Sequence, residues 1–424
     1  MESLLPELLS TLHPDLNEAQ TRALKILESG ENVFLTGGAG TGKSYLLRKF
    51  LKGTQEVKLP ILASTGGAAV LINGRTFHSF FGLGIFEGGA EATIERALTD
   101  RRVVRRIKKA VGFVLDEISM IPGVVLESAE RIARAARGDE RPWGGLRVIA
   151  VGDFAQLPPV TRDSRKRDWA FQNSVWEKSN FVAVELNEIM RSKGDAEFNE
   201  FLSDVRLGIV SPKVREMLDR RATVDVEDIR DSAVLHARKV DVERINLQRL
   251  AELPGESIIF LTEYSGENRM QRAIAAHAPI PEKLELKKGA LVMLRQNDPR
   301  GRWVNGSMGH VEGFSDSEIE VKLLSGNFAN LEKSRFSLLN AEGGEVAAAK
   351  NFPLNLAYAI TIHKAQGTTL DQMRVSLRDL WEPGQAYVAL SRVRSSRGLW
   401  VDDWNESSIF ADPEVLRFQS NLIG

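Results

Sequence analysis

An octapeptide near the start of the chain, GGAGTGKS, has residue types and spacing suited to binding phosphate. It satisfies the pattern Gly-x-x-x-x-Gly-Lys-Ser and lies between an apolar run and a helix-forming stretch, which is the context of a P-loop. Such glycines let backbone N–H groups converge on phosphate oxygens, and the following helix N-terminus adds partial positive charge. The sequence therefore predicts a nucleotide site formed by Gly37, Gly38, Ala39, Gly40, Thr41, Gly42, Lys43 and Ser44.

A second set of candidate residues follows the apolar run FVL, which ends in Asp116 and Glu117. These carboxylates would emerge where a parallel strand meets the nucleotide. We expect Lys43 to reach the β- and γ-phosphates, and Ser44 and Asp116 to hold Mg²⁺, Asp116 through water. Glu117 would polarise the attacking water as the general base. The alternative is a surface acid pair that caps the next helix.

A third candidate lies in LRVIAVGDFAQLPPV, at 146–160. Its first half predicts a buried strand, the next apolar one after the strand of Asp116. Gln156 would then lie beside the metal, where an amide can hydrogen-bond the γ-phosphate or the attacking water. The Pro158-Pro159 pair cannot continue a helix and stiffens the segment after it. The alternative is a rigid loop whose amide has no role.

Short apolar runs that alternate with helical patterns must position these residues. An amphipathic helix is expected at 17–27, and strands at 33–35, 61–64, 111–117, 146–151 and 181–186. This alternation predicts an α/β fold with a parallel sheet. We expect one domain at 1–180 with a small insertion at about 82–100, and a second at 181–285 and 348–424. Turn signals between short strands predict a small β-barrel at 286–347.

Composition narrows the classes of function. The chain has 424 residues, enough for more than one core, and it contains no cysteine, which excludes thiol catalysis and thiolate zinc sites. Its net charge of −1 means that any nucleic acid must be bound by local basic patches. The start lacks the pattern of a signal peptide, and no apolar run approaches a membrane span. We expect a cytoplasmic protein, or a nuclear or mitochondrial one in a eukaryote, with no membrane partner.

Several longer segments resemble the motifs of superfamily 1 DNA helicases in order and spacing: DEISM, GDFAQLPPV, TIHKAQGTTLD and AYVALSRVRS. ASTGGAAVLINGRTFHSFFGLG and LNEIMRSKGDAEFNEFLSDVRLG are similar to segments of the 5′-to-3′ Pif (petite integration frequency) family. The resemblance implies two RecA-like P-loop domains, a wedge at 82–100, and a monomeric ATP-dependent helicase. Its partners would be single-stranded DNA and forked or tailed duplexes, with roles in DNA repair, recombination and telomere maintenance.

The resemblance also implies roles for individual residues. Gln20 matches a glutamine that reads adenine and favours ATP. Arg191 and Arg392 match two arginines that the second domain presents to the γ-phosphate, where a planar guanidinium suits phosphoryl charge. Gly367 matches a backbone position facing nucleotide and strand. Single-strand contacts are implied for Thr65, His78, Ser79, Pro158, Thr361, His363 and Lys364. Surface ion pairs for the arginines and structural roles for the histidines are the alternatives.

Two basic clusters and three rival functions stay open. In RRVVRRIKK, at 101–109, the apolar residues could face the core and leave a solvated basic helix rather than a DNA contact. RDSRKRDW, at 162–169, is a candidate for contacting duplex DNA. The rivals are a RecD- or Dda-like helicase, a DNA-stimulated ATPase that does not unwind, and a P-loop kinase or GTPase. The paired arginines disfavour the last.

Overall fold

A computed structural model of the chain describes residues 15–53, 59–64, 75–84, 89–159, 167–192, 194–222, 232–298, 300, 302–303, 305–339, 345–378 and 380–423. These residues form two compact units. Unit 1 contains the described residues up to Ser64, those from Arg75 to Ser192, and those from Pro413 onwards. Unit 2 contains the described residues from Gly194 to Asp412. In the described part of the chain, no helix is long and apolar enough to cross a membrane.

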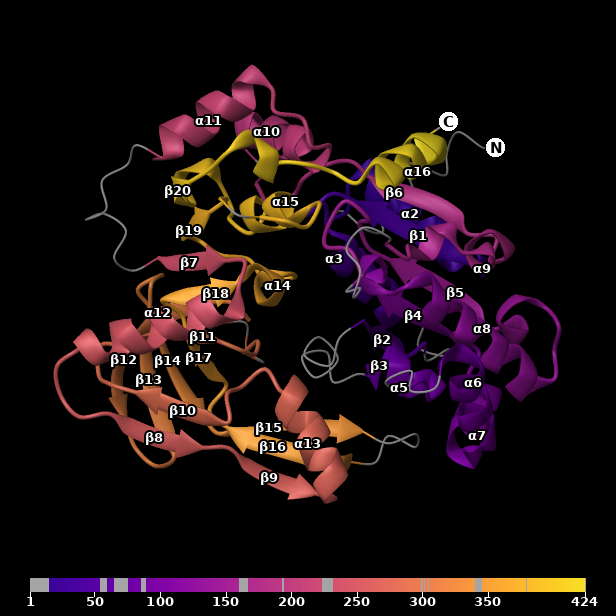
Figure 1. The fold of residues 1–424 in the computed structure, drawn as a ribbon, viewed down its shortest axis with the longest axis horizontal. Helices are drawn as coiled ribbons and strands as arrows, with labels where there is room; N and C mark the ends of the chain where they lie inside the picture. The colour runs from indigo at the N-terminus through magenta and orange to yellow at the C-terminus, as the bar shows by residue number, and fades with distance from the viewer. Residues whose placement is uncertain are drawn as a thin grey trace. The chain divides into compact units, whose positions relative to one another are not determined.

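The centre of unit 1 is a parallel sheet in the order β3-β2-β4-β5-β1-β6 (Figure 1). The strands are β1 (Val33–Gly37), β2 (Ile61–Ala63), β3 (Arg75–Thr76), β4 (Gly112–Asp116), β5 (Arg147–Val151) and β6 (Val182–Leu186). The five strands expected in this region are confirmed. Because β6 pairs with β1, unit 1 continues to residue 192, later than the expected boundary at 180.

Alternate residues of each strand point to opposite faces of this sheet, and each face has its own core. Val33 and Leu35 pack under α2 (Glu18–Glu28) and α3 (Lys43–Gly53), whereas Phe34 belongs to the opposite core. The helices on that second face are α5 (Phe77–Phe81), α6 (Gly89–Thr99), α7 (Arg101–Lys109), α8 (Gly123–Arg137) and α9 (Ser174–Lys178). Burial on both faces explains why the central strands β1, β4 and β5 read as continuous apolar runs.

The region at 82–100 is largely helical, because α6 occupies most of it, and residues 85–88 lie outside the described part. Helix α7 follows directly, with Val103 and Ile107 buried and most of its cations exposed. Arg106 differs, because it donates to the carbonyls of Ser79 and Phe80 at 2.9 Å each and so ties α7 to α5. The predicted core face of α7 is confirmed.

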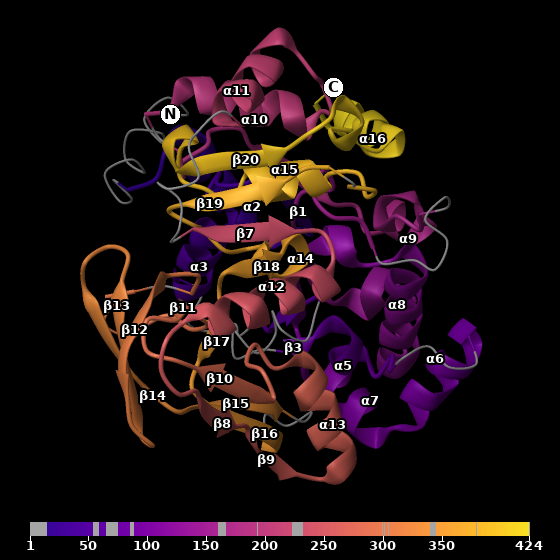
Figure 2. The same cartoon turned by 60° about the vertical axis from the view of Figure 1, so that its left-hand side comes forward.

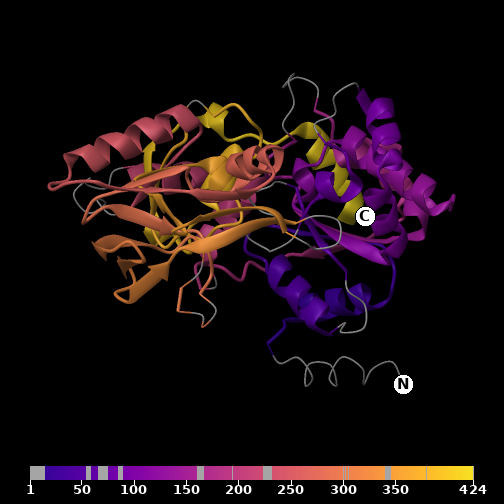
Figure 3. The ribbon, with the colours of Figure 1, turned by 90° about the horizontal axis from the view of Figure 1, so that it is seen from below.

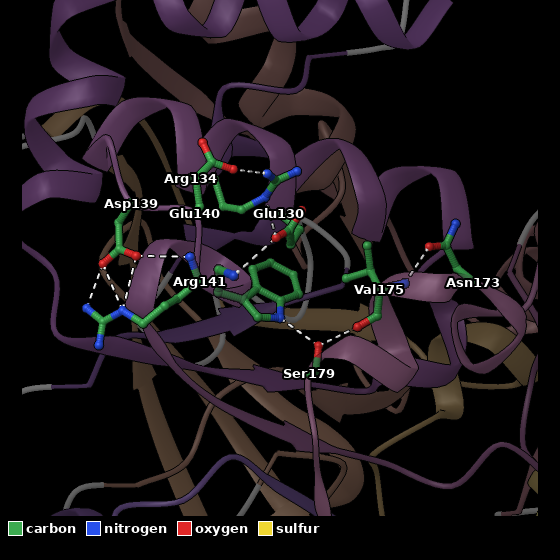
Figure 4. Close-up of polar contacts among 9 residues, drawn as sticks. Glu130, Arg134, Asp139, Glu140, Arg141, Asn173, Val175 and Ser179 are labelled. Atoms are coloured by element: carbon green, nitrogen blue, oxygen red, sulfur yellow. Dashed lines mark hydrogen bonds and ion pairs between the residues drawn. The ribbon is translucent and has the colours of Figure 1, made fainter.

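A buried polar network joins α8 to α9 and to the 3₁₀ turn at Pro142–Gly145 (Figure 4). Glu130 accepts from Arg134 Nε at 2.8 Å and from the backbone N–H of Trp143 at 3.3 Å. Trp143 Nε1 donates to Ser179 Oγ at 2.7 Å, and that hydroxyl donates to the Val175 carbonyl at 2.6 Å. Because buried polar groups are costly when unpaired, this pairing fixes how the two helices pack.

The last described helix, α16 (Pro413–Ile423), packs on unit 1 rather than on the unit that precedes it (Figures 1 and 3). Val415 is buried in the core that contains Phe34 and α8, and Phe418 packs against the same core. The expectation that the second domain runs to residue 424 is therefore wrong at its end. The packing of Val415 and Phe418 on the core of unit 1 explains why α16 belongs to unit 1, although the chain just before it belongs to unit 2.

Unit 2 is built on a smaller parallel sheet in the order β18-β7-β19-β20 (Figure 2). Its strands are β7 (Ala233–His236), β18 (Ala359–Thr361), β19 (Met373–Ser376) and β20 (Leu399–Asp403). Its helices include α10 (Ala196–Arg206), α11 (Pro212–Ala222), α12 (Lys239–Glu252), α14 (Ile362–Ala365) and α15 (Gln385–Leu390). A second parallel α/β core is therefore present.

Between β7 and β18 the chain forms antiparallel sheets. The largest has the order β14-β13-β12-β11-β17 and its own apolar core. Its strands are β11 (Leu291–Leu294), β12 (Met308–Phe314), β13 (Glu318–Leu323), β14 (Phe328–Glu332) and β17 (Leu354–Leu356). Smaller sheets join β8 (Ile258–Leu261) to β10 (Lys283–Leu286), and β9 (Glu263–Gly266) to β16 (Glu345–Asn351) and β15 (Ser334–Leu339), beside α13 (Asn268–His277). Among the described residues no pairing closes a ring, so the strands are seen but not the barrel.

Candidate functional site

The P-loop connects β1 to α3 in unit 1, as its sequence predicts. Gly40 has φ of +81°, and a Cβ there would lie 2.7 Å from Cβ of Arg191, so glycine is required. The Lys43 ammonium donates to the carbonyls of Gly37 at 2.7 Å and Gly38 at 3.0 Å. The loop thus holds its cation at the N-terminus of α3, where an anion is favoured.

Gln20 lies beneath this loop and is only 2% exposed. Its backbone N–H donates to Asn17 Oδ1 at 2.8 Å, and its Oε1 accepts from the Asn17 N–H at 3.2 Å, which forms a capping box at the start of α2. Its Nε2 donates to the Thr41 carbonyl at 3.3 Å. Reading adenine would therefore require Gln20 to exchange bonds that it already makes.

A short segment after β6 lies against the P-loop. The backbone N–H groups of Met190 and Arg191 donate to the Gly40 carbonyl at 2.8 and 3.1 Å, and Asn17 Nδ2 donates to Glu188 at 2.5 Å. Arg191 therefore belongs to unit 1, whereas the family resemblance implied that the second domain carries it. Asn17, which forms the capping box with Gln20, was not predicted to belong to this site, although Asn-x-x-Gln at the start of a helix is a recognisable signal.

The acid pair emerges at the carboxyl end of β4, beside β5 and close to the P-loop lysine. Burial and the charge of Glu117 raise the pKa of Asp116 to about 7, opposed by a backbone hydrogen bond and by Lys43. Glu117 has φ of +54°, a conformation that costs a non-glycine residue about 1 kcal/mol or more. Strain at such a position is typical of functional sites.

Strand β5, which leads into the loop of Gln156, lies between β4 and β1, so its end meets both the acid pair and the P-loop strand. Gly152 approaches Ile118 so closely that a Cβ would lie 2.9 Å from its side chain. Asp153 is fully buried and accepts from the backbone N–H of Ala155 at 3.1 Å, while the Gln156 N–H donates to the Asp153 carbonyl at 3.0 Å. Gln156 is 6% exposed, so its amide is held inside the protein.

Phe154 anchors this loop in an aromatic cluster that sequence inspection missed. Its ring lies 5.6 Å from Phe34, 4.9 Å from Phe171 and 5.5 Å from Trp176. Phe418 of α16 completes the cluster at 5.4 Å from Phe154. Helix α16 is thereby packed against Phe154, which is two residues before Gln156 in the sequence.

The DNA-contact candidates of unit 1 differ in accessibility. Thr65 lies outside the described residues, as does most of the basic stretch at 162–169. Ser79 is exposed on α5, and His78 is half-buried, with burial lowering its pKa. Pro158 is buried, so it presents little surface to a strand in this conformation.

The candidates of unit 2 gather at α14. The Thr361 hydroxyl caps this helix by accepting from the Lys364 N–H at 3.2 Å, and the side chains of His363 and Lys364 are exposed. Gly367, with φ of +74°, is exposed just beyond it. Arg392 is elsewhere in the unit and 2% exposed, with Nε donating to the Val388 carbonyl at 2.7 Å.

No group of three or more histidine or acidic side chains suited to a metal ion occurs in the described part of the chain. A P-loop magnesium site does not need one, because Mg²⁺ typically keeps several waters and binds phosphates with one or two protein oxygens. The Ser44 hydroxyl and the Asp116 carboxylate supply hard oxygen donors of that kind.

Comparison with known proteins gives consistent similarities. Residues 15–216 match the family model for PIF1-like helicase. The chain is 50% identical over 410 residues to ATP-dependent DNA helicase Pif1 of Bdellovibrio bacteriovorus, covering 97% of this chain and 93% of that one. It is 38% identical over 422 residues to ATP-dependent DNA helicase PIF1 of Homo sapiens, covering 98% of this chain but 65% of the human one.

Two solved structures of a Bacteroides Pif1 helicase are also similar. The complex with ADP-AlF4 is 27% identical with a TM-score of 0.82, covering 96% of each chain. The complex with ADP-AlF3 and single-stranded DNA is 27% identical with a TM-score of 0.67, covering 96% of each.

Proposed function

This chain is a member of the PIF1-like helicase family and an ATP-dependent DNA helicase, and from that premise we propose that it moves 5′ to 3′ along single-stranded DNA. The observation that carries the chemical part is the convergence of three strand ends. The P-loop after β1, the acid pair after β4 and Gln156 after β5 all belong to neighbouring strands of one sheet. Membership of this family excludes the rival function of a P-loop kinase or GTPase.

We assign the nucleotide chemistry to these residues. Lys43 and the P-loop amides hold the phosphates, and Glu117 takes a proton from the attacking water. Ser44 and Asp116 would hold Mg²⁺, which neutralises phosphate charge when bound. Arg191 and Arg392 are assigned to stabilising charge on the transferring phosphoryl group. Gln20 is the proposed adenine contact, and Gly367 the proposed backbone contact.

Exposure supports three of the proposed DNA contacts, one in unit 1 and two in unit 2. Ser79 on α5, with His363 and Lys364 on α14, offers hydrogen-bond donors to a phosphate backbone, and the Bacteroides relative was solved with single-stranded DNA. Thr65, His78, Pro158 and Thr361 complete the set on the family resemblance alone, because Pro158 and Thr361 are buried and Thr65 lies outside the described residues. We also propose that the helices at 82–100 act as a wedge and that the β-rich insertion at 286–347 is a barrel-like accessory domain at the fork.

Strand displacement on tailed duplexes tests this proposal. Equal duplexes with a 5′ tail, a 3′ tail or no tail should differ, with ATP-dependent unwinding of the 5′-tailed one alone. Lys43→Ala is the matched negative control, because it should bind single strands but not hydrolyse ATP. Equal unwinding of both tailed substrates would remove the polarity, and DNA-stimulated hydrolysis without displacement would indicate a non-unwinding ATPase.

A further inference from the structure

Arg295 follows β11 in unit 2 and is an unusual arginine, because it is buried and no carboxylate of the described residues pairs with it. It is 7% exposed, and its backbone N–H donates to the Pro353 carbonyl at 2.8 Å, which continues the pairing of β11 with β17 by one residue. Nε is buried and has no hydrogen-bond partner. Within the part of the chain that the structure describes, Nη1 reaches only the sulfur of Met293, at 3.4 Å, and a thioether is a weak acceptor.

The acid nearest along the chain is already committed to a different arginine. Asp298 accepts from Arg302 at 2.9 Å through both Nε and Nη2, and also from the backbone N–H groups of Arg300 and Arg302. Within the described residues, no ion pair of Arg295 is found. Burial lowers the pKa of Arg295 to about 10, which still leaves it charged at neutral pH.

The loop that begins at Arg295 approaches the segment after α14, because a Cβ on Gly306 would lie 3.2 Å from the Thr369 carbonyl. Lys364 on α14 is exposed, yet desolvation by its neighbours and then the charge of Arg295 lower its pKa. The described residues contain no ion pair of Lys364. The same loop holds another donor for which the described residues supply no acceptor, Nε1 of Trp303, which is 6% exposed. Positive charge and unpaired N–H groups are thus concentrated, at a cost to folding.

We propose that Arg295, together with Lys364, binds a phosphate of the single-stranded DNA backbone. The proposal rests on the proposed function and names an additional contact of its DNA surface. A phosphate oxygen would supply an acceptor to the terminal nitrogens of the guanidinium, whose planar fork suits phosphate geometry. DNA is preferred to a free phosphate because Lys364 lies in the segment that resembles single-strand contacts, while the P-loop of unit 1 serves the nucleotide.

The variant Arg295→Met separates this role from a structural one, because the two predict opposite changes in stability. Methionine keeps much of the volume and removes a buried, unpaired charge, so Tm should stay level or rise. Affinity for an oligo(dT) strand should fall about ten- to a hundredfold, the usual size for a hydrogen bond to a charged group. The slope of log affinity against log salt should shrink by about 0.7, the value for one single-strand phosphate.

Arg374→Met is the matched control, because Arg374 in the same unit is paired with Asp402 at 2.7 Å. It should lower Tm and leave the salt slope unchanged. A loss of Tm or of folding in Arg295→Met like that of the control, or a wild-type slope, would overturn the proposal. Arg295→Lys should restore the slope but only part of the affinity.

Two further measurements distinguish a failure of the Arg295 contact from a failure of the proposed helicase function. Wild-type unwinding and oligo(dT) binding are measured beside the variants, so an active wild type with an unaffected Arg295→Met rejects this site alone. An inactive wild type rejects the helicase assignment and the site with it. Inorganic phosphate at matched ionic strength should raise the Tm of the wild type and of Arg295→Met equally, because the P-loop can bind it in both. A larger rise in the wild type than in Arg295→Met would show a free-phosphate site instead.

Discussion

Truncation of Phe418 should impair the Gln156 loop, although residue 418 lies far from that loop along the chain. The Phe418 ring stacks on Phe171 at 4.3 Å with planes 16° apart, and it meets Phe154 at 5.4 Å edge-on. It also lies 5.8 Å from Trp176. Phe418→Ala removes this support from α16 without touching any proposed nucleotide contact.

The cost follows from burial and ring geometry. A fully buried Phe→Ala change costs about 3–5 kcal/mol, and Phe418 is half-buried, which lowers the expectation to about 2–3 kcal/mol, including the lost ring pairs. For a unit of this size each kcal/mol lowers Tm by about 2–4 °C. We therefore expect a Tm loss of about 5–10 °C for unit 1.

The assay combines thermal unfolding with ATP hydrolysis, with and without oligo(dT). Because the nucleotide contacts stay in place, KM for ATP should change little, while the DNA-stimulated kcat should fall several-fold. Phe418→Leu should recover most of the Tm, and Asn421→Ala, exposed on the same helix, should match the wild type in both assays. The reasoning is refuted if Phe418→Ala keeps the wild-type Tm and DNA stimulation.

Three further outcomes are expected. Glu117→Gln should keep ATP binding and slow ATP hydrolysis at least about 10²-fold. Glu117→Gly should slow hydrolysis equally and also raise Tm, because glycine tolerates a φ of +54°. A lower Tm in the glycine variant would contradict backbone strain at this position. Gln156→Ala should retain ATP affinity but narrow the difference in DNA affinity between ATP-analogue and ADP states, measured by fluorescence anisotropy, and an unchanged difference would make the amide a bystander. The pKa of Asp116 is about 7 in the folded protein, against an ordinary value of 3.8. Without Mg²⁺ the folded state therefore binds more protons than the unfolded state between these two pH values, and the free energy of unfolding falls as pH rises from 3.8 to about 7. Asp116→Asn should lose that decline in urea titrations from pH 4 to 8, and parallel curves would show that the shift is absent.

The local parts of the site were predictable from the sequence because each is encoded in consecutive residues. The P-loop glycines, the acids after β4 and Gln156 after β5 follow from strand-end patterns, and the sheet brings these ends together. The resemblance to known motifs added the family, which the comparisons confirm. The wedge, the barrel and the individual residue roles stay predictions.

Features that depend on distant partners were not predictable in this way. Phe418 reads as one apolar position of an amphipathic helix, and nothing near it indicates packing on Phe154. Arg295 reads as an ordinary cation, because its burial and its missing partner exist only in the folded chain. The boundary at 180 failed for a similar reason, since the pairing of β6 with β1 joins residues about 150 positions apart.

The return of the chain to unit 1 at α16 has a consequence for the order of synthesis. The 220 residues from 193 to 412 must be made before the helix that closes the Phe154 cluster. At about 5–20 residues per second, that interval lasts about 10–45 s. During this interval the nascent first unit exposes the apolar aromatic surface that α16 later covers. A chain truncated before Val415 would keep that surface exposed and would therefore be prone to aggregate.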